Sequence, residues 1–286
     1  MNEAPTGQAV LLSPLVTRVL APNPSPYTYT GTQTHLVGDR RVAVIDPGPD
    51  DPAHLEALLA AIDGRETVAI VCTHTHRDHS PLSRALTAAT GAPIIGCAPL
   101  ALGDPETRSD AAFDFDYVPD RILGDGDGLE GDGWTLEAVA TPGHTSNHLA
   151  FALPQEAALF TGDHVMGWST SIVSPPDGDM GAYMTSLDTL IGRDDAVYYP
   201  GHGEAVRDNP QRLARSMLGH RKQREGQIVR LLATGEASVA DLVARMYVGL
   251  DPRLVPAAER SVLAHLIDLA RRGLAERRSE GLWQAG

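Results

Sequence analysis

The segment VCTHTHRDHS at residues 71–80 places three histidines and one aspartate directly after a run of apolar residues. Residues two apart in an extended segment point the same way, so His74 and His76 can present their imidazoles to a single metal ion. Asp78 and His79 follow where the chain turns towards the next helix, so they can face a neighbouring position. This cluster predicts a metal centre at the end of a buried strand. The alternative is a polar strand-to-helix turn that binds no metal.

Three later segments repeat one design, in which an apolar strand is followed by a glycine and then by a side chain that can bind a metal. These segments are LEAVATPGHTS, ALFTGDH and VYYPGHG, and they supply His144, Asp163 and His202. Glycine has no Cβ and lets the backbone approach a site closely. Four such strand ends can converge on one edge of a β-sandwich, which favours the metal centre over the polar turn.

Five imidazoles and two carboxylates are too many for one tetrahedral zinc ion, which takes four ligands. The set suits two metals about 3.5–4 Å apart that share a carboxylate. We expect two Zn²⁺ ions, although this mixed ligand set would also accept manganese or iron. The expected arrangement is His74, His76 and His144 on the first metal, Asp78, His79 and His202 on the second, and Asp163 bridging the two.

Short apolar runs alternate with helical patterns through the first two thirds of the chain, which predicts an α/β fold with sheets covered by helices. From about Asn209 the chain has helical patterns and ends in a short stretch that can form a hairpin, which predicts a small winged-helix-like domain. We therefore expect a catalytic domain at residues 1–208 and a C-terminal domain at 209–286. The expected strands are 42–46, 67–72, 93–96, 136–140, 148–153, 158–160 and 196–200, and the expected helices are 51–62, 80–91, 210–233, 237–247 and 256–276.

The net charge of −14 is unevenly distributed. Residues 1–203 contain 9 Lys and Arg against 27 Asp and Glu, whereas residues 204–286 contain 14 against 10. An acidic body repels polyanions, so generic nucleic-acid binding is disfavoured there. The basic C-terminal part leaves RNA binding open, and the alternative is a solvated helical surface.

The N-terminal segment MNEAPTGQAVLLSPLVTRVL has no basic start before its short apolar stretch, so it does not resemble a secretory signal. No window approaches the roughly 18 apolar residues of a membrane helix. We therefore expect a cytoplasmic protein without membrane contact. In that compartment a disulfide is not expected, and Cys72 and Cys97 are interpreted as small buried hydrophobes.

The motifs THTHRDH, TPGHT, FTGD and PGH, in this order, resemble those of the metallo-β-lactamase superfamily of binuclear hydrolases. The resemblance covers most of residues 10–203 and implies an αββα sandwich with the metals at one edge of its two sheets. The stretches NPSPYTYTGTQTHLVG, TGDHVMGWST and PGHG followed by HRKQREGQI resemble the β-lactamase-like protein 2 branch. Its members carry a C-terminal winged-helix-like domain, and the animal members are described as endoribonucleases on single-stranded RNA.

The expected function is that of a metal-dependent hydrolase in which a metal-bridging hydroxide attacks a small ester, thioester or lactone-like substrate. Asp163 would link the metals, and Asp78 would also accept a proton as the bond breaks. The alternatives are an endoribonuclease on single-stranded RNA, a true β-lactamase and a winged-helix regulator without activity. The absence of an export signal argues against the β-lactamase, and the seven-ligand set argues against the regulator.

Several further residues are weaker candidates. Tyr183 and His220 are predicted to contact substrate, with a packed aromatic and a solvated helical face as their alternatives. We interpret His148 as structural. The acidic loop at 104–117 is either a lid or a connector. The apolar face of the helix at 256–276 is expected to pack on the catalytic domain or on a second subunit, so a homo-oligomer is possible.

Overall fold

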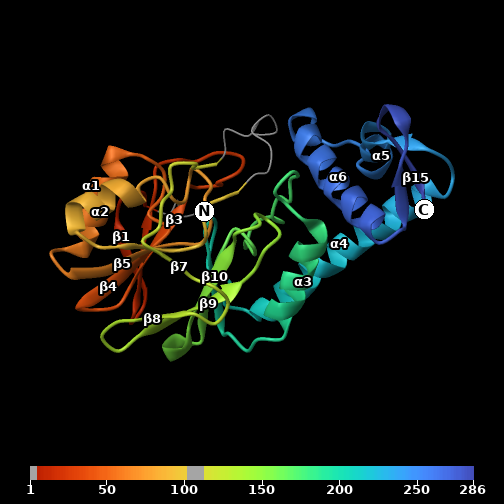
Figure 1. The fold of residues 1–286 in the computed structure, drawn as a ribbon. Coiled ribbons are helices and arrows are strands. Elements are labelled where there is room, and N and C mark those ends of the chain that lie inside the picture. The colour runs from red at the N-terminus through yellow and green to blue at the C-terminus, as the bar shows by residue number, and fades with distance from the viewer. Residues whose placement is uncertain (1–4, 102–112) are drawn as a thin grey trace. The chain divides into compact units, whose positions relative to one another are not determined.

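The computed structural model describes residues 5–101 and 113–286, and Figure 1 shows its helices and strands. The chain packs into two compact units, each built from several segments. The predicted domain boundary between residues 208 and 209 stays a prediction. The first unit comprises Met1–Thr141, Asn147–Thr170 and Asp194–Pro210, and the second comprises Pro142–Ser146, Ser171–Arg193 and Gln211–Gly286.

The first unit contains two β-sheets. The larger sheet has seven strands in sequence order, with antiparallel pairing from β1 to β4 and parallel pairing from β4 to β7. Its strands are β1 (Ala9–Ser13), β2 (Val16–Leu20), β3 (Gln33–Val37), β4 (Arg41–Ile45), β5 (Glu66–Cys72), β6 (Ile94–Gly96) and β7 (Arg121–Ile122).

The smaller sheet has five strands in the order β12-β11-β10-β9-β8. One apolar core joins the inner faces of both sheets and includes Val71, Phe151, Phe160 and Tyr199. This arrangement is a β-sandwich in which each sheet buries one face against the other. The strands are β8 (Gly128–Glu130), β9 (Thr135–Ala140), β10 (Leu149–Leu153), β11 (Ala158–Gly162) and β12 (Val197–Pro200).

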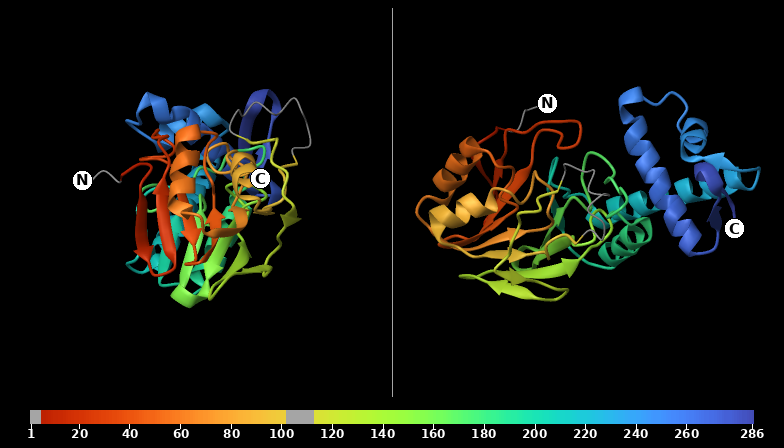
Figure 2. Two further views of the ribbon diagram at one scale, coloured as in Figure 1. Left: turned by 90° about the vertical axis from the view of Figure 1, so that its left-hand side faces the viewer. Right: turned by 45° about the horizontal axis from the view of Figure 1, so that its top comes forward.

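Two helices, α1 (Pro52–Ile62) and α2 (Ser83–Thr90), cover the other face of the seven-stranded sheet, as both views in Figure 2 show. The Asp51 carboxylate caps the start of α1 by accepting hydrogen bonds from two backbone N–H groups. Helix α2 ends at Gly91, whose φ of 74° lies in the left-handed region that favours glycine. The helix predicted at residues 80–91 therefore ends at this glycine.

The second unit holds a separate apolar core that includes Ile228, Leu242, Leu266 and Trp283. Its three-stranded sheet has the order β13-β15-β14, so the predicted terminal hairpin is present as β14 and β15. The elements of this unit are α3 (Met180–Ile191), α4 (Pro210–Leu232), β13 (Ala237–Ser238), α5 (Val239–Met246), α6 (Val255–Arg271), β14 (Ala275–Arg277) and β15 (Leu282–Ala285).

All the predicted strands and helices have a counterpart in the structure, with ends that differ by a few residues. The strands β1, β2, β3, β7, β8 and β13 were not predicted. Strand β3 reads QTHLV, yet all five of its residues are buried. Its polar side chains find partners inside the protein, as when the Thr34 hydroxyl donates to the Asp46 carbonyl at 2.7 Å. The polar residues of this segment explain why β3, an inner strand of the sheet, was not predicted from the sequence. Within the part of the chain that the structure describes, no helix is both long and apolar enough to cross a membrane.

Candidate metal centre

The turn after β5 presents the first four predicted ligands. The His79 and Ser80 backbone N–H groups both donate to the His76 carbonyl, at 2.9 and 3.2 Å, which closes a tight turn. This turn separates His74 and His76, on its first limb, from Asp78 and His79 on its second. His74 and His79 are fully buried. The spacing argument from the sequence therefore matches the path of the backbone.

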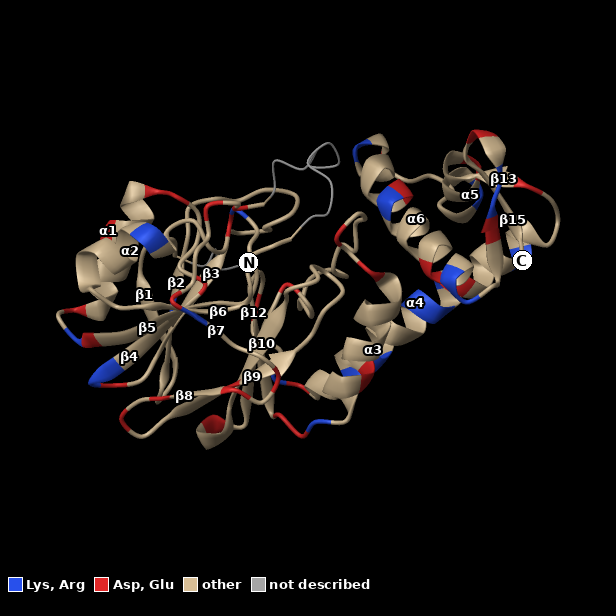
Figure 3. Cartoon of the chain, in the orientation of Figure 1, with Lys and Arg blue, Asp and Glu red and all other residues tan. Residues whose placement is uncertain are grey.

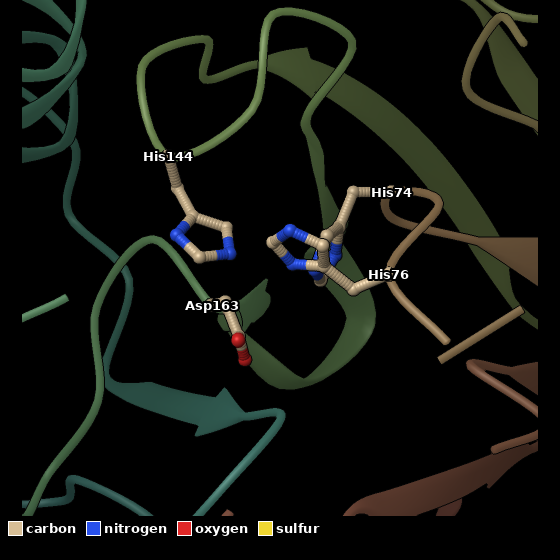
Figure 4. Close-up of side chains that lie close together, drawn as sticks. All are labelled: His74, His76, His144 and Asp163. Atoms are coloured by element: carbon tan, nitrogen blue, oxygen red, sulfur yellow. The ribbon is translucent and has the colours of Figure 1, made fainter. Parts of the chain in front are cut away.

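The first group consists of His74, His76, His144 and Asp163. One ligand atom from each of these side chains lies within 4.8 Å of the others, and Figure 4 shows the rings and the carboxylate facing a common point. His74 Nε2 and His76 Nδ1 are 2.9 Å apart.

The second group consists of Asp78, His79 and His202. The Asp78 Oδ2 atom lies 3.1 Å from His202 Nε2 and 3.4 Å from His79 Nε2. The Oδ1 atom of Asp163 lies 3.4 Å from His79 Nε2 and 3.3 Å from His202 Nε2. Asp163 thus reaches both groups, which is the position that a bridging carboxylate requires. The seven side chains are brought together as predicted, and their role as ligands stays a prediction.

Glycines at the strand ends allow this close packing. A Cβ atom on Gly201 would lie 2.7 Å from His79 Cε1 and 2.8 Å from Asp163 Oδ1. A Cβ atom on Gly162 would lie 2.7 Å from His148 Nε2, and its φ of 48° also favours glycine. Both glycines belong to the strand, glycine and ligand pattern of the sequence.

The orientation of the imidazoles fits metal binding. Four of the histidines direct Nδ1 at an acceptor of the protein, which in the neutral tautomer leaves a lone pair on the inward Nε2 atom. The acceptors are Thr73 Oγ1 for His74 at 2.9 Å, Asp46 Oδ2 for His79 at 2.9 Å, the Ile172 carbonyl for His144 at 2.6 Å and the Gly31 carbonyl for His202 at 3.1 Å.

The charges of the cluster also favour cations. Burial opposes protonation of His202, but Asp163 and Asp78 outweigh it and raise the pKa of His202 to about 10. The pKa of His79 is raised well above its usual range by Asp78, Asp163 and Asp46, against the effect of burial. The pKa values of Asp78 and Asp163 are lowered well below their usual range by the same histidines, although burial acts the other way. Metal ions would compete with protons for these imidazoles.

The sequence analysis missed Asp46, which holds His79 in place. Its Oδ2 atom accepts from His79 Nδ1 at 2.9 Å and from the Thr73 hydroxyl at 2.8 Å, and its Oδ1 atom accepts from the Thr73 N–H at 2.8 Å. Asp46 has a φ of 50°, which is uncommon outside glycine. The signal in the sequence was an aspartate directly after the apolar strand VAVI. Asp163, one of the two predicted ligand carboxylates, occupies the same position after β11.

His148 supports the bridging aspartate and is absent from both ligand groups. Its Nε2 atom accepts from the Asp163 N–H at 3.2 Å, and its Nδ1 atom therefore donates to the Thr141 hydroxyl at 2.8 Å. This agrees with the structural interpretation of His148. His164, which follows the bridging aspartate, is fully buried, and its ring centroid lies 6.0 Å from that of His148.

The two predicted substrate contacts lie in the second unit. Tyr183 on α3 is fully buried, and its backbone lies where a Cβ atom on Gly143 would be, at 2.3 Å. His220 on α4 is half-buried, and burial together with Arg221 and Arg224 lowers its pKa. Their contact with substrate stays a prediction.

Most of the predicted lid at 104–117 lies outside the described residues. Its last part is described and packs beside the turn that follows β5. The Phe113 ring lies 4.7 Å from that of His76, and Asp114 pairs with Arg84 at 3.0 Å. Cys72 and Cys97 are buried and unbonded to each other, and burial raises the pKa of both thiols, as expected of small buried hydrophobes.

Known protein families match both parts of the chain. The metallo-beta-lactamase superfamily matches residues 28–202, and the beta-lactamase associated winged helix domain matches residues 238–283. Among solved structures, a beta-lactamase domain protein from Burkholderia ambifaria superimposes with a TM-score of 0.82 at 20% identity, covering 100% of this chain and 96% of that one. TTHA1623, solved in a di-iron-bound form, is 29% identical with a TM-score of 0.53 and covers 66% of this chain and 93% of that one.

Three relatives illustrate the range of similar proteins. Lactamase-like protein adaB of Aspergillus niger is 33% identical over 225 residues, which cover 78% of this chain and 65% of that protein. Atrochrysone carboxyl ACP thioesterase of Aspergillus chevalieri is 34% identical over 228 residues, or 77% and 67% of the two chains. Beta-lactamase-like protein 2 homolog of Caenorhabditis elegans is 31% identical over 271 residues, or 93% and 87%. The chain thus spans about two thirds of the length of the two fungal relatives.

These matches confirm the predicted α/β sandwich, the C-terminal winged-helix domain and the likeness to β-lactamase-like protein 2. The chain belongs to the metallo-β-lactamase superfamily and carries a beta-lactamase associated winged helix domain at residues 238–283.

Proposed function

We propose that this hydrolase cleaves acyl thioesters with the help of two divalent cations, zinc being the expected metal. The observation that carries the proposal is the set of seven converging ligand side chains in a chain that is 34% identical to an acyl carrier protein thioesterase. The first cation would be held by His74, His76 and His144, the second by Asp78, His79 and His202, and Asp163 would touch both.

When bound, the cations lower the pKa of a shared water and polarise the carbonyl of the substrate. The chain supplies the orientation of the ligands, since Asp46 and the other acceptors fix the imidazoles. Of the two predicted ligand carboxylates, Asp78 has the greater access to solvent, its side chain being 27% exposed against 11% for Asp163. It would accept the proton that the attacking water releases.

A leaving group that departs as an anion needs no proton donor in the site. A thiol has a pKa of about 8.5 and leaves as a thiolate, whereas the amine of an amide must be protonated. This difference supports a thioester over a β-lactam.

The test is a paired assay on protein whose zinc, manganese and iron content has been counted. The chain would be offered acyl thioesters, the matching oxygen esters, lactones and a β-lactam, with an Asp78→Ala, His79→Ala double variant as the control for contaminants. We expect about two metals per chain and the highest kcat/KM on thioesters, lost in the double variant. Faster turnover of the β-lactam or the lactone would overturn the thioester assignment.

An endoribonuclease is the second candidate. It is favoured by the basic C-terminal part and by the likeness to Beta-lactamase-like protein 2 homolog over 93% of this chain. A fluorescent single-stranded RNA included in the same assay tests it. Cleavage by the native chain but not by the double variant would put this function first, and intact RNA would remove it.

A further inference from the structure

Arginine and histidine side chains gather inside the second unit, away from the predicted metal ligands in sequence. Arg221, Arg224 and His220 lie on α4, and His265 lies on α6, two helices that carry several basic residues (Figure 3). We call these four residues the arginine cluster. Arg221 is 4% exposed and His265 is 1% exposed, whereas Arg224 and His220 are half-buried. The cluster is therefore an interior feature with two members at its edge.

Among the described residues, the side chains and carbonyl groups that contact Arg221 and Arg224 are neutral. Arg221 donates to the Ser171 carbonyl and to the Ser261 hydroxyl, and its guanidinium lies 5.3 Å from the centre of the Tyr183 ring. Arg224 donates to the Gln227 side chain at 2.8 Å and lies 4.4 Å from the centre of the Tyr247 ring. Neither arginine forms an ion pair with a carboxylate of the described residues.

The acidic residues of this region are already paired with other arginines. Arg272 binds Glu225 and also Asp268, the latter at 2.8 Å. Arg271 binds Asp179. These carboxylates therefore do not neutralise Arg221 or Arg224, and a buried guanidinium without an anion costs several kcal/mol in an apolar interior.

Several nitrogens of the cluster have no hydrogen-bond partner among the described residues. Both ring nitrogens of His265 are buried and unsatisfied, although most buried polar atoms in proteins are paired. Burial, together with the neighbouring charges of Arg221 and Arg272, lowers the pKa of His265 to about 3. The other unsatisfied atoms are Arg221 Nε, Arg224 Nε and His220 Nδ1.

The cluster is continuous with the loop that carries His144, through contacts inside the second unit. Arg221 binds the carbonyl of Ser171, and the carbonyl of the next residue, Ile172, accepts from His144 Nδ1. Tyr183, under the Arg221 guanidinium, packs against Gly143. The arginine cluster therefore adjoins the loop that carries His144.

We propose that the arginine cluster is a binding site for a phosphate group. Phosphate presents several strong acceptor oxygens in different directions, which suits four side chains on two helices that lie near enough to influence one another's charge and that carry unsatisfied nitrogens. A carboxylate offers two oxygens in one plane and would leave part of this set unsatisfied. In the reaction proposed above, on which this second step rests, the group is the phosphate ester of the thiol carrier, as in coenzyme A or a phosphopantetheine arm.

Arg224→Gln tests the site, because Arg224 is half-buried and its loss leaves the apolar core of the unit intact. Arg230→Gln, an exposed arginine on the same helix, is the matched control. Arg224→Lys tests whether a positive charge at this position is enough for phosphate binding. Thermal melts check that each variant folds. Titration calorimetry with inorganic phosphate should show affinity reduced about tenfold or more in Arg224→Gln, since hydrogen bonds to charged groups are strong, but not in Arg230→Gln. Equal affinities in folded protein would overturn the site.

Kinetics identify the source of the phosphate. The ratio of KM for an acyl-pantetheine to KM for its 4′-phosphate should be well above one in the native chain and should fall towards one in Arg224→Gln. A ratio near one in the native chain would overturn the carrier assignment while leaving the thioesterase proposal standing. Phosphate binding that depends on Arg224, without turnover of any thioester, would support the site and overturn the proposed function. Tighter Arg224-dependent binding of single-stranded RNA would replace the carrier with nucleic acid.

Discussion

The predicted metal centre and the arginine cluster both bury charge, but with opposite sign. Around His79 the carboxylates of Asp46, Asp78 and Asp163 outnumber any fixed positive charge, and histidine protonation is what balances them. Around Arg221 the fixed charge is positive and the partners are neutral. Buried charge has to be compensated. The comparison indicates that one cluster is built for cations and the other for an anion.

The substitution expected to have the largest effect on the predicted metal centre is Asp163→Asn, which keeps the shape of the side chain and removes its charge. Because Asp163 Oδ1 lies between His79 and His202, we expect metal content to fall below two per chain. Activity should fall by more than the roughly 100-fold that follows loss of an outer hydrogen-bond partner. Metal analysis and kcat/KM measure this. Asp188→Asn, an exposed aspartate on α3, should change neither. Full metal content in Asp163→Asn would contradict a bridging role.

Asp46→Asn should have a smaller effect, because Asp46 touches a ligand and not a metal. We expect metal affinity to fall about 10- to 100-fold, since the amide holds His79 Nδ1 less strongly. Competition with a chelator measures the affinity, and Asp50→Asn, an exposed aspartate in the same loop, is the control. If Asp46→Asn binds metal as well as the control does, the positioning role is wrong.

The pH dependence of stability tests the charge balance of the predicted metal centre. The pKa of His202 is raised from its usual 6.5 to about 10 in the folded chain. The resulting stabilisation of the metal-free chain is complete below pH 6.5 and is lost as the pH rises towards 10. Urea unfolding with a chelator at pH 6.5–9 should therefore show declining stability, less steeply in His202→Gln. The gain in stability on adding metal should grow over the same range. A flat profile for the metal-free chain would contradict this account.

The smallest expected effect is that of Gly219→Ala on α4. A Cβ atom there meets nothing within 4 Å, so the substitution should stabilise the helix by about 0.5–1 kcal/mol. Urea unfolding measures this gain, while metal content and phosphate affinity should stay at native values. A change in metal content or in phosphate affinity would show that ligand binding depends on the overall stability of the chain. The effects of the other substitutions could then not be assigned to one cluster.

The sequence was informative where a single local pattern, an apolar strand followed by a side chain that can bind a metal, identifies the residues. Five of the seven predicted ligands follow an apolar strand closely, three of them directly after a glycine and two within the HxH pair. Spacing alone predicted that His74 and His76 lie on one side of the chain. Asp46 was missed although it also follows a strand, because its function depends on a contact with His79, 33 residues away. Strand β3 was missed because its polar residues are satisfied only by partners in other segments, such as the Asp46 carbonyl for Thr34.

The sequence by itself determined the alternation of strands and helices, the change of character near Asn209 and the predicted ligand set, because each depends on residues close together in the chain. Only the tertiary structure decided which charges lack a partner. Arg221 is 50 residues from Ser171 and 40 from Ser261, and nothing in its local sequence shows that both partners are neutral. Charge compensation depends on distance in space, so the excess of carboxylates around His79 and the neutral partners of Arg221 can be identified only in the folded chain.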